Sequence, residues 1–174
     1  LGRRFLGRGK PKSAAHWDAQ YQSGRWDQLE SAEEFSRYAL LASLTRRFTP
    51  AFGRVLEVGC GTGILSRHLQ GSGLRYTGFD LSEAAVYAIQ TALADSFPQL
   101  PLATVVGDVK HAALVDEVLG RERPSVIFHA GAYKHVPLME ETNAWQAVRN
   151  NAYGTWVLGM AAVAAKVEKF VLVS

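Results

Sequence analysis

Three glycines at alternate positions, Gly59, Gly61 and Gly63, lie between two acidic residues, Glu57 and Asp80. Glycine has no Cβ, so it lets a loop turn tightly and lets a ligand approach the backbone closely. The glycines follow a short apolar run and precede a helical pattern, the arrangement that places a cofactor at the carboxyl end of a strand. Asp80 follows about 20 residues later, where an acid accepts hydrogen bonds from ribose hydroxyls. The pattern therefore predicts a nucleotide-cofactor site.

The spacing within this loop favours S-adenosylmethionine (SAM) over NAD. A dinucleotide loop requires a third glycine at position 64, where this chain has Ile64. Glu57 is placed to accept from the ammonium of an amino-acid ligand, and Asp108, after a third strand, to contact an adenine amino group. The acidic-x-Gly-x-Gly-x-Gly loop, with Trp17-Asp18-x-x-Tyr21 and Gly78–Ser82, resembles class I SAM-dependent methyltransferases over residues 13–82. The resemblance implies methyl transfer to a saccharide or another small acceptor.

Residues 83–174 carry a different resemblance. Four stretches are similar to the polysaccharide-biosynthesis branch of the extended short-chain dehydrogenases, which includes NAD(P)-dependent UDP-sugar 4,6-dehydratases and epimerases: Gly107-Asp108-Val109, Arg123–Glu140, Asn150-Asn151-x-x-Gly154-Thr155 and Phe170–Ser174. The resemblance implies that Ala130 and Gly131 pack against the cofactor and that Asn151 braces the active-site helix and strand. Lys134 and His135, near the sugar, are the candidate catalytic residues. The chain ends before the family's Thr-Asp-Lys segment, so we expect it not to complete the dehydratase reaction by itself.

The elements that must position these residues alternate between strands and helices. Residues 1–12 form a basic flexible arm, 13–50 a helical extension with Ser31 and Glu34 at capping-box spacing, and 51–174 the cofactor domain. Apolar runs predict strands near 55–58, 76–79, 102–106, 125–129 and 170–173, with helices between them, the last one at 145–166. This alternation predicts an α/β, Rossmann-like three-layer sandwich with a mostly parallel five-stranded sheet.

Composition limits the remaining function classes. The net charge of +3 comes from residues 1–12, which carry five Arg or Lys and no acid, so the body has no basic stripe for a nucleic acid. The longest nearly apolar run, 156–165, is far shorter than the roughly 20 residues of a transmembrane helix. The single cysteine, Cys60, fits a reducing, cytoplasmic compartment. The histidines are scattered, so we expect no metal site, and His129 is expected to be a core residue.

Three hypotheses follow. The first is a SAM-binding methyltransferase-like enzyme acting in surface-polysaccharide or nucleotide-sugar metabolism. The second is a truncated NAD(P)-dependent nucleotide-sugar dehydratase or epimerase, and the third is a non-catalytic Rossmann remnant. The two resemblances together read as a hybrid, which a natural fusion, a damaged gene or an assembly artefact would explain equally well. In each case the partner is a small molecule or saccharide, and the exposed fifth strand predicts a homo-oligomer.

Overall fold

A computed structural model describes residues 13–96, 101–133 and 143–173. The expected basic arm therefore lies outside the described residues, as do Lys134 and His135. The N-terminal extension comprises α1 (Ala14–Gln22), η1 (Asp27–Glu30) and α2 (Ala32–Phe48). The strands are β1 (Arg54–Val58), β2 (Arg75–Asp80), β3 (Leu102–Val106), β4 (Val126–His129) and β5 (Lys169–Leu172), and the helices among them are α3 (Ile64–His68), α4 (Glu83–Ser96), α5 (Ala112–Glu122), α7 (Ala144–Ala147), η2 (Val148–Gly154) and α8 (Thr155–Ala164).

The five strands form one parallel sheet in the order β3-β2-β1-β4-β5. The chain moves outward in one direction from β1 to β3 and then returns to the other side of β1 with β4, so the strand order reverses between β1 and β4. Val58 at the end of β1 is in register with Phe79 on β2 and His129 on β4, which brings their carboxyl ends together. The predicted Rossmann-like α/β fold is confirmed, and its ligand crevice is expected at this reversal.

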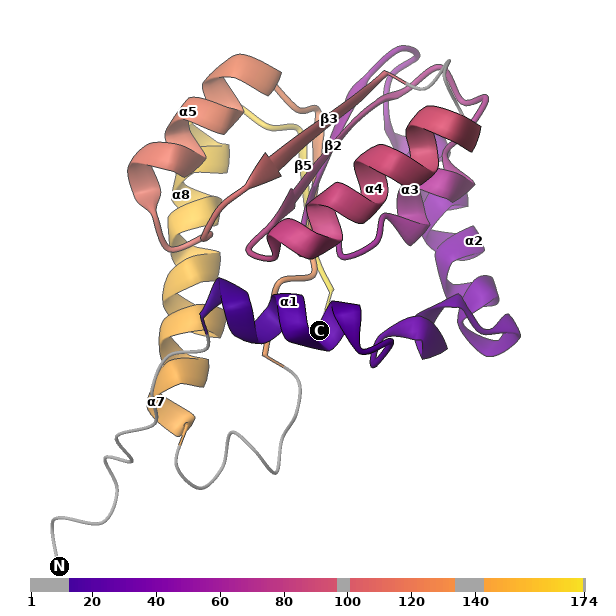
Figure 1. Ribbon diagram of the computed structural model, residues 1–174. Coiled ribbons are helices and arrows are strands. Elements are labelled where there is room, and N and C mark those ends of the chain that lie inside the picture. The colour runs from indigo at the N-terminus through magenta and orange to yellow at the C-terminus, as the bar shows by residue number, and fades with distance from the viewer. Residues whose placement is uncertain (1–12, 97–100, 134–142, 174) are drawn as a thin grey trace, which may run out of the picture.

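Helices cover both faces of the sheet, which explains why the strands are apolar throughout rather than alternating. On one face, Leu56, Val58 and Ile127 pack against α5 and α8; on the other, Val55 and Phe128 pack in a cluster that includes Leu65 and Leu69 from around α3 and Ala42 of α2. Figure 1 shows α5 and α8 on one side of the strands and α2, α3 and α4 on the other. The strand ends are thereby held between two apolar layers.

Two local expectations need correction. Ser31 does precede α2, but its side chain makes no capping hydrogen bond, and Glu34 pairs with Arg37 at 2.5 Å instead. The helix expected over 145–166 is continuous in backbone conformation, but its middle part, η2, is a π-helix. By contrast, Ser82 does cap α4, because its Oγ accepts from the Ala85 amide at 3.2 Å. Over the described residues, no helix has both the length and the apolarity to cross a membrane.

Candidate functional site

A cavity of about 330 Å³ lies at the carboxyl edge of the sheet, where the strand order reverses. This volume lies at the lower end of the range typical of small-molecule sites. The loops after β1, β2, β3 and β4 all contribute to its walls. Seven of the eight predicted cofactor-binding residues line it, and Gly63 does not; the seven are Glu57, Gly59, Gly61, Asp80, Asp108, Ala130 and Gly131.

The glycine loop is tightly packed against its surroundings. Gly59 has φ +80°, and a Cβ there would lie 2.5 Å from the Gly131 amide nitrogen, so the loops that follow β1 and β4 approach each other closely only because this residue has no side chain. Gly61 has φ +53°, and a Cβ there would lie 2.8 Å from the Tyr21 hydroxyl of α1. Gly63 lies behind the loop, where its carbonyl accepts from Ser66 Oγ at 2.5 Å. The first two glycines thus shape the cavity and the third supports it.

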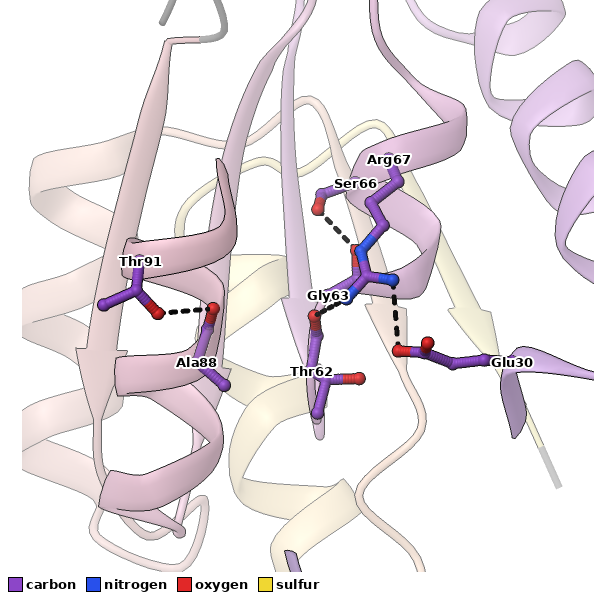
Figure 2. A network of polar contacts seen from close by, with 7 residues as sticks. All are labelled: Glu30, Thr62, Gly63, Ser66, Arg67, Ala88 and Thr91. Carbon is purple, nitrogen blue, oxygen red and sulfur yellow. Dashed lines mark hydrogen bonds and ion pairs between the residues drawn. The ribbon is translucent and has the colours of Figure 1, made fainter. Parts of the chain in front are cut away.

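Arg67 of α3 connects the glycine loop to the N-terminal extension. Its Nη1 pairs with Glu30 Oε1 of η1 at 3.0 Å, and its Nη2 donates to the Thr62 carbonyl at 3.5 Å. Figure 2 shows the guanidinium between these two partners, with Ser66 and Gly63 beside it. The extension is therefore attached to the site and does not merely precede it in the sequence.

Asp80, the last residue of β2, and Asp108, just after β3, both hold backbone near the cavity. Asp80 is buried, and its carboxylate accepts from the Gly61 amide at 2.9 Å and from the Ser82 amide at 2.9 Å. Asp108 accepts from the Lys110 amide at 2.9 Å and pairs with Lys110 Nζ at 2.7 Å. A carboxylate has about four acceptor sites, so each acid retains capacity for a ligand donor.

Glu57 does not supply the negative charge that was expected of it. Its side chain is buried and accepts a hydrogen bond from the Tyr76 hydroxyl. Burial raises the pKa of Glu57 to about 8, so the carboxyl is largely protonated at neutral pH. A protonated carboxyl attracts a ligand ammonium only weakly. Burial also raises the pKa of the Cys60 thiol, whose side chain packs inside the loop, so Cys60 fills space rather than acting as a nucleophile.

Two consecutive asparagines in the π-helical segment hold the loop that follows β4. Asn150 Nδ2 donates to the Gly131 carbonyl at 2.7 Å. Asn151 accepts from the Tyr133 amide at 2.8 Å and donates to the Tyr133 carbonyl at 3.0 Å. Lys110 Nζ donates to Asn150 Oδ1 at 3.2 Å and thereby links Asp108 to the same group. The small residues beside the cavity are therefore fixed by side chains about 20 residues further along the chain.

Sequence reasoning missed the aromatic wall of the cavity, formed by Trp17, Tyr21 and Trp26. The motif Trp17-Asp18-x-x-Tyr21 was noted in the sequence only as part of the methyltransferase resemblance, and not as a sign that these aromatic side chains line the site. His129 is fully buried and its Nε2 lies 2.9 Å from Thr155 Oγ1, the environment of a core histidine. Across the described ranges, no group of three His, Cys, Asp or Glu side chains has the arrangement of a metal site.

Solved structures with the same fold are numerous. Pen from Bacillus thuringiensis is 31% identical, with a TM-score of 0.61 over 70% of this chain and 38% of that one. UDP-glucose 4-epimerase from Bifidobacterium longum, solved in complex with NAD+ and UDP, is 22% identical, with a TM-score of 0.59 over 70% of this chain and 36% of that one. The second likeness shows the fold alone.

The curated relatives that match are much longer than this chain. Capsular polysaccharide biosynthesis protein CapD from Staphylococcus aureus is 36% identical over 93 residues, which make up 53% of this chain and 15% of CapD. The chain thus spans about a seventh of that relative's length and under two fifths of the length of the solved neighbours.

A family model described as "Polysaccharide biosynthesis protein" matches residues 59–174. The match begins within the glycine loop and runs through β2 and α4, so the expected change of family near residue 83 is not found. The methyltransferase prediction is wrong, and neither the resemblance behind it nor SAM as cofactor is supported. The prediction gave too much weight to Ile64 and to a charge on Glu57 that burial suppresses. With two thirds of its residues inside that match, the chain belongs to the polysaccharide biosynthesis protein family.

Proposed function

We propose that this chain binds NAD(P) and forms the cofactor-binding part of an enzyme that epimerises or dehydrates a nucleotide sugar in polysaccharide biosynthesis. The Bifidobacterium longum epimerase was solved with NAD+ and UDP, and its fold matches this chain. The chain spans only 36% of that epimerase, so the activity of a whole enzyme is part of this proposal. The relatives' roles in polysaccharide biosynthesis support the pathway class.

One observation carries the proposal: the loop after β1, the acids after β2 and β3, and the small residues after β4 converge on one cavity at the strand-order reversal. This is the position at which open parallel sheets bind nucleotides. The residues fit such a ligand, because Gly59, Gly61, Ala130 and Gly131 line the cavity and add little side-chain bulk to it.

The chain's own residues would bind and orient the cofactor. Asp80 would accept from ribose hydroxyls with the acceptor capacity that the Gly61 and Ser82 amides leave, and Asp108 would accept from the adenine amino group. Asn150 and Asn151 would keep the Gly131–Tyr133 backbone in place beside the cofactor. When bound, NAD(P) would accept a hydride from the sugar and return it.

Calorimetric titration with NAD+, NADH and NADPH tests the proposal. We expect the wild-type chain to bind at least one of them. Asp80→Asn should raise its Kd by about tenfold or more, because a hydrogen bond to a charged group contributes about 1.5–3 kcal/mol. Asp116→Asn, at an exposed position on α5, is the matched control and should leave the Kd unchanged.

Thermal unfolding of each variant shows whether it is folded. A folded wild-type chain that binds none of the three dinucleotides would contradict the proposal. Equal affinities of wild type and Asp80→Asn would refute only the role of Asp80.

A further inference from the structure

The N-terminal extension contributes to a cavity whose other lining residues, apart from Glu57 and Val58 of β1, lie in the family-matched part of the chain. The family match begins at Gly59, whereas α1, η1 and α2 all precede it. Trp17 and Tyr21 of α1, together with Trp26, nevertheless line the cavity beside the glycine loop and the loop after β4. In Figure 1, α1 crosses beyond the ends of the strands instead of lying on a face of the sheet.

Contacts at several points hold α1 in this position. Asp18 Oδ1 accepts from Ser82 Oγ at 2.6 Å and from the Ala84 amide at 3.1 Å, which fixes the helix to the start of α4. The Trp17 ring lies 5.6 Å from the Tyr133 ring, centroid to centroid, on the other side of the strand-order reversal. The helix therefore bridges the cavity mouth from the β2 side to the β4 side.

The side chains that α1 presents are suited to a flat, polar-edged ligand. Trp17 is only half-buried, so part of its indole faces the cavity. The Tyr21 hydroxyl lies over Gly61, where a side chain on the loop would collide with it. Burial and the nearby Asp80 raise the pKa of Tyr21, so its hydroxyl keeps the proton that it can donate.

We propose that Trp17 and Tyr21 are ligand-binding residues of this site: the Trp17 indole packs against a flat ring of the dinucleotide, and the Tyr21 hydroxyl donates to a ligand oxygen beside Gly61. The inference rests on the proposed function, since it takes NAD(P) as the ligand. It adds that part of the ligand site comes from a segment outside the family match.

NADH is the probe, because it absorbs where tryptophan emits and its binding can be followed both by calorimetry and by energy transfer. Trp17→Ala should raise the Kd for NADH roughly 5- to 100-fold, the range that corresponds to loss of one aromatic stacking contact. It should also reduce the energy transfer that remains at saturation. Trp156→Ala, which removes an exposed tryptophan on α8, should leave the Kd unchanged.

Tyr21→Phe provides a second test that preserves the packing of the ring. It should raise the Kd for NADH about 3- to 10-fold, the effect of one lost hydrogen bond. Tyr87→Phe, at an exposed position on α4, is its control and should have no effect.

The outcomes separate this inference from the proposed function. If wild type binds NADH and both α1 variants, folded by circular dichroism, bind it with unchanged Kd, the inference is overturned and the proposed function stands. If wild type binds none of the dinucleotides, both are overturned. If Trp17→Ala does not fold, Tyr21→Phe decides: weaker binding supports the inference, and unchanged binding refutes it.

Discussion

Replacing Gly59 with alanine should destabilise the protein strongly, for two separate reasons. The new Cβ would lie 2.5 Å from the Gly131 amide nitrogen, 2.6 Å from the Gly131 Cα and 2.8 Å from the Ala130 carbonyl carbon. These are backbone atoms of a loop that Asn150 and Asn151 hold, so they cannot rotate away. The φ of +80° is a second penalty, because an L-residue in the left-handed region costs about 1–2 kcal/mol.

Adding about 1–3 kcal/mol for overpacking gives a total loss of about 2–5 kcal/mol. That is a large part of the roughly 5–15 kcal/mol by which proteins are stable. Urea unfolding measures this loss directly as a midpoint lowered by about 1–2.5 M, given a typical slope of about 2 kcal/mol per molar urea.

Two other Gly→Ala variants separate the causes. Gly71 has φ +65° with nothing within 4 Å of its Cβ position, so Gly71→Ala should cost only the backbone penalty of about 1–2 kcal/mol. Gly120 is exposed in α5 and also has nothing within 4 Å of its Cβ position. Gly120→Ala should therefore raise the free energy of unfolding by about 0.5–1 kcal/mol. If Gly59→Ala costs no more than Gly71→Ala, the close approach of the loops that follow β1 and β4 is refuted.

Three further predictions concern pH, the loop after β4 and assembly. The pKa of Glu57 is about 8 in the folded chain against 4.5 normally, so its contribution to stability is complete below about pH 4.5 and is lost as pH rises through about 8. Across this pH interval, the free energy of unfolding of Glu57→Gln should fall less steeply than that of the wild type. Equal slopes of the two profiles, measured by urea unfolding at each pH, would contradict the raised pKa of Glu57. Asn151→Ala loses both hydrogen bonds to the Tyr133 backbone and should lower the free energy of unfolding by about 1–3 kcal/mol; an unchanged urea midpoint would count against this bracing. The edge strand β5 exposes Phe170 and Leu172, so light scattering should detect a homo-oligomer, and a well-behaved monomer would refute that expectation.

The strands and the place of the cavity could be predicted from the sequence because both depend on local patterns. Short apolar runs predicted each strand to within a residue or two, and those of β1, β2 and β3 end in glycine or an acid. Parallel strands necessarily bring those ends to one edge. The position of Asp80 beside the glycine loop follows from the same rule.

The identity of the ligand and the aromatic wall of the cavity, formed by Trp17, Tyr21 and Trp26, could not be predicted in this way. Ile64 seemed decisive as a single side chain, but it begins α3, and the loop backbone is shaped by Gly59 and Gly61. The charge state of Glu57 depends on its burial with Tyr76, which no local pattern reveals. The position of α1 depends on Asp18 contacting Ser82, 64 residues away in the sequence.

The π-helical turn of η2 determines how this helix can change in length. A π-turn bonds residues five apart where an α-turn bonds residues four apart, so η2 holds more chain per turn than the helices on either side. Deleting one residue from it would favour a regular α-helix, whose narrower turn makes up for the missing residue. Val157, Leu158, Ala161 and Ala162 would then still face the sheet. We therefore expect the packing of α8 to survive a single-residue deletion in this segment, with the loss falling on the contacts that Asn150 and Asn151 make.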